Sequence, residues 1–285
     1  MANDVSKIII DALPAFSKSQ RKIANYILNN YDKAAYMTAA RLALTTGISE
    51  STVVRFAREL GFSGYSEFQL ALQELARNKL THSQRIEVTK QRLGTGDVIA
   101  NVMEADINKI KHTLENLDRK SFYSSVDAIL AAKTVYIMGV RSSEPIARLL
   151  NHSLSLIFDN VKFVQPTSVA EVFEQMFSIS EHDVLIAFSF PRYSSKVVSA
   201  VKYANSRNAQ VIGITDSESS PLAEHANYLL LAESDMASYM DSLVAPVSII
   251  NAIIIEITSR REKEITKRFD TLEEVWDEYD VYAKR

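Results

Sequence analysis

Hydrophobic residues recur at helical spacing through the first 80 residues of the chain. Most of these apolar stripes follow a serine or threonine that can cap a helix, and they end at a residue that stops one. The pattern predicts an all-α domain over residues 1–80. Its helices are expected over 5–13, from Ser17 or Ser19 to Asn29, and over 39–45, 50–60 and 66–80.

The helix expected over residues 50–60 has two opposite faces and local signals at both ends. Ser49 can accept a hydrogen bond from a backbone N–H of the first turn, and Gly61 suits the left-handed residue that ends a helix. At about 100° per residue, one face is apolar and the other carries hydroxyls and charges. The apolar face holds Val53, Phe56, Ala57 and Leu60, and the polar face holds Ser51, Thr52, Arg55, Arg58 and Glu59.

A short helix over 39–45, a turn at Gly47 and this second helix have the order of a helix-turn-helix, whose second helix enters the major groove of DNA. Ser51, Thr52 and Arg55 would then face bases, because Arg can donate to guanine O6 and N7. Arg58, one turn later, would contact a phosphate. The plainer interpretation, a helical bundle with solvated arginines, is disfavoured because three signals coincide.

The segment Ser49–Phe68, SESTVVRFARELGFSGYSEF, closely resembles the recognition-helix segment of the RpiR family of bacterial transcriptional regulators. The resemblance implies binding to double-stranded operator DNA.

Residues 81–132 are expected to form a helical connector. The polar stretch from Arg77 to Lys90 and the break at Gly94-Thr95-Gly96 indicate a domain boundary. Apolar spacing then predicts a helix from Val98 to Leu117, followed by another that carries Phe122, Val126 and Ile129. These helices could pack on the following domain or on a second subunit.

After residue 133 the apolar period changes to that of buried strands alternating with helices. This order predicts a doubly wound, mainly parallel sheet over 133–265, and thus an α/β protein with an all-α N-terminal domain. Strands are expected over 134–138, 161–164, 183–189, 210–215 and 227–231, and helices over 144–158, 169–178, 194–207 and 247–263. Residues 266–285 read as an amphipathic helix, for which packing on the core is the simpler expectation and a partner subunit the alternative.

Two loops should lie at the carboxyl ends of neighbouring strands, where parallel sheets bind ligands. Each precedes a helix N-terminus and carries serine hydroxyls and one arginine, which together suit an anion. The candidate ligand-binding residues are Gly139, Arg141, Ser142 and Ser143 in the first loop and Ser189, Arg192, Ser194 and Ser195 in the second. Serines that only cap helices, beside solvated arginines, are the alternative for either loop alone.

Residues 133–257 resemble a sugar isomerase (SIS) domain, which follows the helix-turn-helix domain in RpiR-type regulators. Gly139, Ser143, Ser189 and Ser194 match the family motifs Gly-x-Gly-x-Ser and Ser-x-Ser-Gly-x-Thr/Ser. Three positions depart, because Arg141 and Arg192 replace glycines and Pro191 replaces a serine. The resemblance implies a sugar-phosphate effector, and the departures indicate an altered phosphate site in which guanidinium groups hold a phosphate or a second acidic group.

Composition sets outer limits. The chain of 285 residues is 47% apolar and 24% charged, with no cysteine and no apolar run long enough to span a bilayer. We expect a cytoplasmic protein with no membrane contact, no cofactor and no metal site. The net charge is −3, but it is unevenly distributed. Residues 1–80 hold ten Lys or Arg against seven Asp or Glu, a net charge of +3, so the remaining residues carry −6. This asymmetry fits a DNA-binding N-terminal region.

The combined expectation is a regulator of sugar metabolism genes, assigned as a repressor from family habit only. It would work as a homodimer or homotetramer without catalytic residues. A SIS-type phosphosugar isomerase is the alternative, since carboxylates and a histidine that could act as a base stand in this region. These are Glu144, His152, Glu171, Glu174 and Glu224. An interaction module without any ligand is the third and weakest interpretation.

Overall fold

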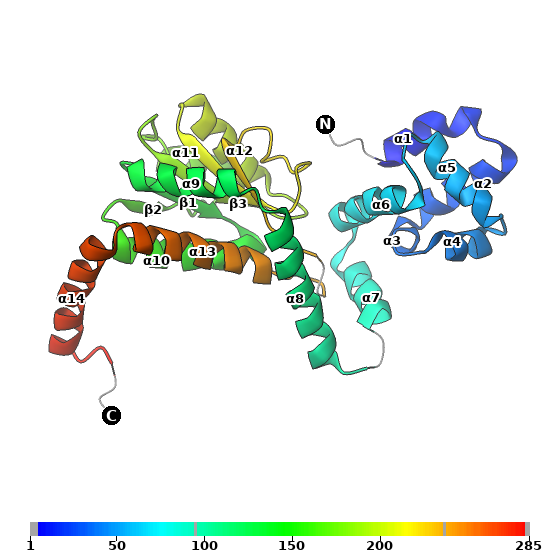
Figure 1. The fold of residues 1–285 in the computed structure, drawn as a ribbon. Coiled ribbons are helices and arrows are strands. Elements are labelled where there is room, and N and C mark those ends of the chain that lie inside the picture. The colour runs from blue at the N-terminus through cyan, green and yellow to red at the C-terminus, as the bar shows by residue number, and fades with distance from the viewer. Residues whose placement is uncertain (1–4, 94–95, 236–237, 283–285) are drawn as a thin grey trace. The chain divides into compact units, whose positions relative to one another are not determined.

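The computed structural model describes residues 5–93, 96–235 and 238–282, and Figure 1 traces the elements. Contacts divide the chain into two compact units. The head comprises Met1–Val102 and Asp235–Asp241, and the body comprises Met103–Ser234 and Ser242–Arg285. The sequence break at Gly94-Thr95-Gly96 falls partly outside the described residues, and the division between the units comes later, after Val102.

Every helix predicted for residues 1–80 is confirmed, and the described part of the head contains two more, α3 and α7. The second of these overlaps the polar stretch from Arg77 to Lys90, where few apolar residues indicate a helix. The head helices are α1 (Val5–Ala12), the 3-10 turn η1 (Leu13–Ala15), α2 (Lys18–Asn29), α3 (Tyr31–Ala34), α4 (Ala39–Thr46), α5 (Glu50–Glu59), α6 (Tyr65–Lys79) and α7 (His82–Leu93).

The core of the head is built around Phe56 of α5. Its ring lies 5.1 Å from that of Phe16 and 5.8 Å from that of Phe68, centroid to centroid. Tyr65 at the start of α6 donates a hydrogen bond from its hydroxyl to the Met37 carbonyl at 2.8 Å, and burial raises the pKa of Tyr65 to about 12. The phenol therefore stays protonated and keeps α6 joined to the turn before α4.

A short segment from the C-terminal half of the sequence completes the head. Arg85 of α7 forms an ion pair with Asp241 at 2.9 Å, and the two side chains are only 3% and 7% exposed. His82 contacts the Tyr239 carbonyl through Nδ1 at 3.2 Å. Asp235–Asp241 thus belongs to the head although it lies between two elements of the body in sequence.

The body contains the predicted α/β layers around a five-stranded sheet of order β2-β1-β3-β4-β5. All neighbouring strands are parallel, so the expected mainly parallel sheet is entirely so. The central strands β1 and β3 are buried along their whole length, as sheets covered on both faces require. The strands are β1 (Val135–Gly139), β2 (Val161–Phe163), β3 (Val184–Phe188), β4 (Gln210–Thr215) and β5 (Tyr228–Leu231).

Helices cover both faces of this sheet. Three helices provide most of the helical residues that share one core with Ile137 and Ile186, and two helices share the other with residues such as Tyr136 and Leu185. The first group is α9 (Arg119–Ala131), α10 (Glu144–Ile157) and α13 (Val244–Arg260), and the second is α11 (Val169–Gln175) and α12 (Ser195–Ser206). Alternate strand residues therefore serve opposite cores.

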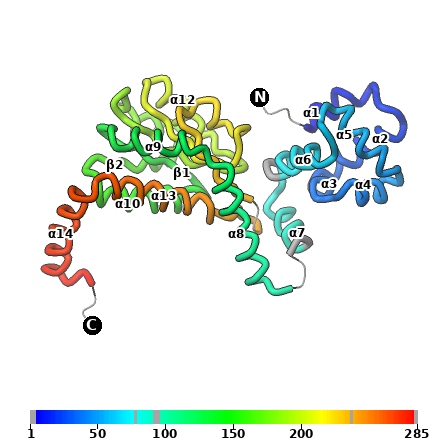
Figure 2. Tube along the Cα trace, in the orientation of Figure 1, coloured from blue at the N-terminus to red at the C-terminus, as the bar shows by residue number. Residues whose placement is uncertain are grey.

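Two further helices extend beyond these layers. α8 (Val98–Asn116) precedes α9, and α14 (Glu262–Glu278) follows a bend after α13, as the tube in Figure 2 shows. The expectation that the C-terminal helix packs on the core was wrong for most of its length. Ile265 is the one buried residue of α14, whereas Val275, Tyr279 and Tyr282 are exposed. Among the described residues, no helix is both long and apolar enough to cross a bilayer.

Candidate DNA-binding and ligand-binding sites

The pair α4 and α5 has the local geometry of a helix-turn-helix. Gly47 ends α4 with a φ of 66°, and Gly61 follows α5 with a φ of 96°, both in the left-handed region that glycine tolerates. Ser49 caps α5, because its Oγ accepts a hydrogen bond from the Thr52 N–H at 3.4 Å. The boundaries of α5 are therefore fixed by residues next to it in sequence.

The two faces of α5 separate as the sequence predicts. The apolar residues Val53, Phe56 and Ala57 are buried in the core of the head. Ser51, Arg55 and Arg58 are exposed, and Thr52 is half-buried. These four predicted DNA-binding residues thus lie on the side of α5 that the core leaves open.

Local contacts hold the polar side chains of α5. The Ser49 hydroxyl lies 2.7 Å from that of Thr52 and 3.1 Å from that of Ser51. Arg55 Nε is 3.7 Å from Glu59 Oε1 in a pair that is largely open to water, so it costs little to exchange Glu59 for another anion. Arg58 Nε donates to the Ser63 carbonyl at 3.4 Å. The Arg58 side chain is therefore oriented toward the turn after the helix, whereas Arg55 lies beside Glu59 on the helix itself.

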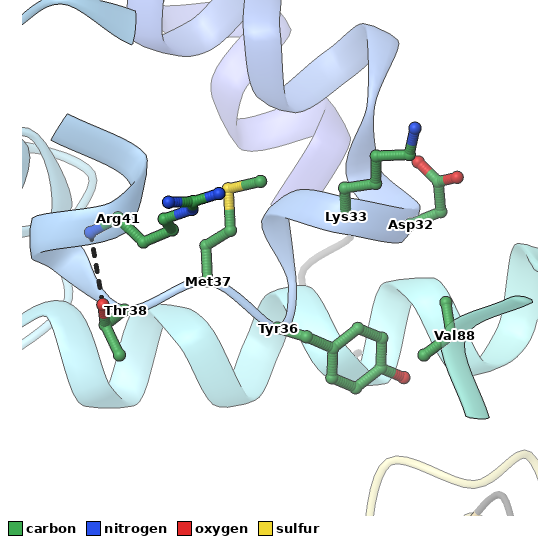
Figure 3. A pocket seen from close by; sticks show the side chains of 7 residues that line it. All are labelled: Asp32, Lys33, Tyr36, Met37, Thr38, Arg41 and Val88. Atoms are coloured by element: carbon green, nitrogen blue, oxygen red, sulfur yellow. Dashed lines mark hydrogen bonds between the residues drawn. The ribbon is translucent and has the colours of Figure 1, made fainter. Parts of the chain in front are cut away.

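The head also contains a hollow of about 450 Å³. Figure 3 shows seven side chains around it, with the Arg41 N–H donating to Thr38 Oγ1 at 3.2 Å. They come from α3, from α4 with the turn before it, and from α7: Asp32, Lys33, Tyr36, Met37, Thr38, Arg41 and Val88. No residue of either predicted site lines this hollow, so it takes no part in them.

In the body, the two predicted ligand loops lie side by side. β1 and β3 are neighbours in the sheet, with Gly139 paired to Phe188 at their carboxyl ends. The chain passes from β1 to β2 on one side, and the connection from β2 then crosses back past β1 to β3 on the other side, so the strand order reverses between β1 and β3. Ligands of doubly wound sheets bind in the crevice at that point. Both loops begin there.

Gly139 ends β1 at a place where a side chain does not fit. A Cβ there would lie 2.6 Å from the Ser143 carbonyl oxygen and 2.8 Å from Ala147 Cβ. The loop Arg141–Ser143, a 3-10 turn that leads into α10, therefore folds back closely over the strand end. Gly139 thus allows the loop to approach the strand end this closely, and its predicted role in ligand binding stays a prediction.

Arg141 and Arg192 both adopt left-handed backbone conformations, with φ of 57° and 65°. Such a conformation costs a residue with a Cβ roughly 1–2 kcal/mol and is normal for glycine. The loops thus keep a glycine-like backbone while each displays an exposed guanidinium group. Among the described residues Arg141 has no carboxylate partner. A strained backbone at the crevice is typical of a site where a side chain serves a ligand.

The serines of the two loops differ in exposure. Ser143 and Ser189 are buried, Ser142 and Ser195 are exposed, and Ser194 is half-buried. The Ser194 N–H donates to Ser189 Oγ at 3.4 Å, which ties the start of α12 to the end of β3. Buried Ser189 therefore organises its loop, and the more open serines are the ones that a ligand could reach.

Comparison with known proteins matches both parts of the chain. Residues 4–79 match the helix-turn-helix domain of the rpiR family, and residues 128–256 match the SIS domain. Together they cover well over half of the chain, in the order found in RpiR-type regulators. The chain belongs to the RpiR family.

Individual relatives agree with this membership. The transcriptional regulator HexR of Escherichia coli is 27% identical over 256 residues, which is 87% of this chain and 86% of HexR. The fold resembles that of Vibrio vulnificus NanR complexed with ManNAc-6P, with a TM-score of 0.61 and 23% identity over 98% of this chain and 99% of NanR. The sugar isomerase domain of an RpiR transcription factor from Sphaerobacter thermophilus gives a TM-score of 0.59 at 23% identity, over 61% and 97% of the two chains.

The structure brings three more side chains of this RpiR-family chain, those of Tyr193, Lys196 and Asp216, to the edge of the sheet where the ligand site is predicted. Tyr193 donates its hydroxyl to Asp216 at 2.9 Å, which joins the second loop to the end of β4. Lys196 Nζ donates to the Thr167 carbonyl at 2.7 Å, which joins α12 to the loop after β2. These residues were missed because their partners are more than 20 residues distant, and no local pattern marks such pairs.

Two of the carboxylates considered as isomerase bases already have hydrogen-bond partners. Glu144 Oε1 accepts from Arg148 at 2.9 Å, and Glu171 accepts from the Thr167 hydroxyl at 2.6 Å and its N–H at 2.7 Å. The Thr167 hydrogen bonds hold the pKa of Glu171 below its ordinary value. An ionised Glu171 that caps its own helix segment is a poor shuttle for protons near pH 7.

Proposed function

We propose that this RpiR-family chain is a sequence-specific DNA-binding regulator of sugar metabolism genes whose body binds a sugar phosphate between the β1 and β3 loops. The observation that carries the proposal is a helix-turn-helix with an exposed arginine face in the same chain as two arginine-bearing loops that begin at the paired ends of β1 and β3. Ser51, Thr52 and Arg55 would read bases, and Arg58 would hold a phosphate of the DNA backbone.

In the body, Arg141 and Arg192 would hold the anionic groups of the effector. An arginine donates several N–H groups in a planar fork that fits phosphate and carboxylate oxygens. The hydroxyls of Ser142, Ser194 and Ser195 and the N–H groups at the start of α12 would add further donors. NanR, which shares the fold, was solved with ManNAc-6P, and this supports a sugar phosphate as the ligand class here.

Effector binding would act on DNA through a two-state homo-oligomer. A ligand shifts such an equilibrium only through different affinities for the two states. A symmetric pair of heads would contact half-sites separated by roughly 34 Å or a multiple of it. We propose that effector binding lowers the affinity for DNA, as in a repressor that is released from its operator by its effector.

A thermal-shift screen of sugar phosphates and sugar acids tests the ligand class. The hit is then titrated into wild-type protein, the Arg141→Ala variant and the Arg192→Ala variant, and operator binding is repeated with it. We expect both variants to lose at least tenfold in affinity. An unchanged affinity in both would remove the crevice from the proposal, while loss of DNA affinity on adding the hit would support the repressor sign.

The same purified protein separates a regulator from an isomerase. The proposal predicts that the hit is recovered unconverted after prolonged incubation. Turnover of any phosphosugar that disappears in a Glu144→Gln or Glu171→Gln variant would favour the isomerase instead.

A further inference from the structure

The exposed side of α8 carries a continuous row of large apolar side chains. Met103, Ile107, Ile110 and Leu114 are 63%, 62%, 36% and 55% exposed. Their spacing of four, three and four residues places them in one narrow row along the helix. This set of four is the α8 stripe. Water contacts it in the single chain, although an apolar row of this kind is stabilised when it is covered.

The other side of α8 already has its partners in the body. Lys109 and Thr113 are buried, Lys109 lies 3.3 Å from Asp106, and Thr113 Oγ1 accepts from the Glu233 N–H at 2.9 Å. Ser242 donates to Asp106 at 2.7 Å. The contacts of Asp106 and Thr113 with the body fix the rotation of α8 about its axis, so the stripe keeps one orientation on the surface of the body.

The α8 stripe is self-complementary in an antiparallel pairing. Its spacing of four and three residues is that of a coiled-coil seam, in which each row packs into the other. If two copies cross near residues 106 and 107, Met103 of one copy meets Ile110 of the other, and Ile107 lies beside its own copy. Leu114 would then meet Ile99, which is earlier on the same helix and is 69% exposed. A two-fold axis produces such reciprocal contacts.

The charges beside the stripe favour the same orientation. Glu104 and Lys111 are exposed, lie on one flank of the stripe and have no ion-pair partner among the described residues. In an antiparallel pair each flank meets the same flank of the other copy, so Glu104 would face Lys111. A parallel pair would instead bring this flank against Asp106, which Lys109 and Ser242 already occupy.

We propose that the α8 stripe is an isologous contact in which two copies of this chain pair through antiparallel α8 helices. The occupant is therefore a second copy of this chain. The proposal concerns the surface and its direction, and it does not depend on the identity of the effector or on the operator.

Cysteine cross-linking tests the direction, because the chain has no cysteine of its own. A disulfide requires Cα atoms within about 7 Å. We expect an Ile107→Cys chain to form disulfide dimers on mild oxidation, and a mixture of Met103→Cys and Ile110→Cys chains to form mixed dimers. Met103→Cys alone should stay uncross-linked, since its two copies would be about 10 Å apart along the seam.

The control is Ile255→Cys, an isoleucine on α13 with 64% exposure. Rapid disulfide formation by Met103→Cys alone would contradict the antiparallel pairing and indicate a parallel one. Cross-linking of every α8 variant no faster than the control would overturn the contact altogether.

Mass in solution tests the contact without oxidation. Ile107→Glu places two carboxylates beside each other at the two-fold axis, and we expect it to lower the mass measured by sedimentation, whereas Ile255→Glu should not. Glu104→Lys should weaken the dimer, and adding Lys111→Glu should restore it. An Ile107→Glu chain that keeps the wild-type mass, or a double charge variant weaker than the single one, contradicts the proposal.

Discussion

The two candidate sites of this chain are built in opposite ways. In the head, the predicted DNA-binding residues lie on one helix whose caps, turn and buried face all lie between Gly47 and Gly61. In the body, two loops about 50 residues apart meet only because β1 and β3 pair in the sheet. A site held by one helix tolerates changes elsewhere, whereas a site assembled by a sheet depends on the close packing at its strand ends.

The largest predicted effect concerns the buried ion pair between Arg85 of α7 and Asp241, a residue distant in sequence that completes the head. Arg85→Ala removes the guanidinium group from a buried ion pair with Asp241, and breaking such a pair typically costs about 3–5 kcal/mol. We expect increased hydrogen exchange in α7 and an earlier unfolding transition in urea. Arg55→Ala, which removes an exposed pair with Glu59, is the control and should change stability by less than about 1 kcal/mol. If both variants lost the same free energy of unfolding, the buried pair would stabilise the head no more than the exposed pair does.

The next effect concerns the strand end in the body. Gly139→Ala forces a Cβ against the Ser143 carbonyl, and overpacking of this kind costs about 1–3 kcal/mol. We expect a lower midpoint for the body and loss of the effector response, with DNA binding by the head kept. Gly96→Ala is the matched control, because its nearest contact would be an ordinary 3.5 Å from the Asn101 side chain. Wild-type effector affinity in Gly139→Ala would contradict the role of close approach.

A third prediction distinguishes the roles of Arg55 and Arg58 of α5 in DNA binding. Arg55→Ala should cost about 1–3 kcal/mol of operator binding and relax sequence preference at one position, as loss of a base contact does. Arg58→Ala should weaken all sequences alike and reduce the salt dependence of binding. Binding to operator and unrelated DNA over a range of salt concentrations measures both. If neither change affects operator binding, α5 does not read DNA.

The smallest predicted effect on stability comes from Arg141→Gly, which should raise stability while lowering effector affinity. Arg141→Gly removes a side chain from a left-handed backbone, so we expect stability to rise by up to about 1 kcal/mol while effector affinity falls. Arg141→Lys keeps the charge and the strain but lacks the planar fork, and it should bind with intermediate affinity. Thermal unfolding and calorimetric titration give the two quantities. Tighter effector binding by Arg141→Gly would assign Arg141 a role other than holding the ligand.

The contrast between the sites also explains what the sequence could predict. Capping residues and apolar spacing identified α4 and α5 almost to the residue, because those signals act within a few positions. The alternation of strands and helices likewise predicted the parallel sheet and which loops end at its edge.

Other features depend on contacts that no local pattern records. The left-handed backbone of Arg141 and Arg192 is imposed by the fold around each loop, and the arginines themselves gave no sign of it. The Tyr193–Asp216 and Arg85–Asp241 contacts join distant positions. The C-terminal helix was expected on the core because its apolar spacing is amphipathic, but such spacing does not specify which surface it meets.

The inclusion of Asp235–Asp241 in the head has a practical consequence for dividing this protein. The chain passes from one unit to the other three times, after Val102, after Ser234 and after Asp241, so no single cut separates them. A fragment that ends at residue 102 would keep Arg85 without Asp241, and a fragment that starts at residue 103 would keep the carboxylate without its guanidinium. The N-terminal half, expressed alone, would lack a piece of the head, and the C-terminal half would carry that piece without the rest of the head. A pair of fragments that matches the two units would have to carry the Asp235–Asp241 segment on the N-terminal one.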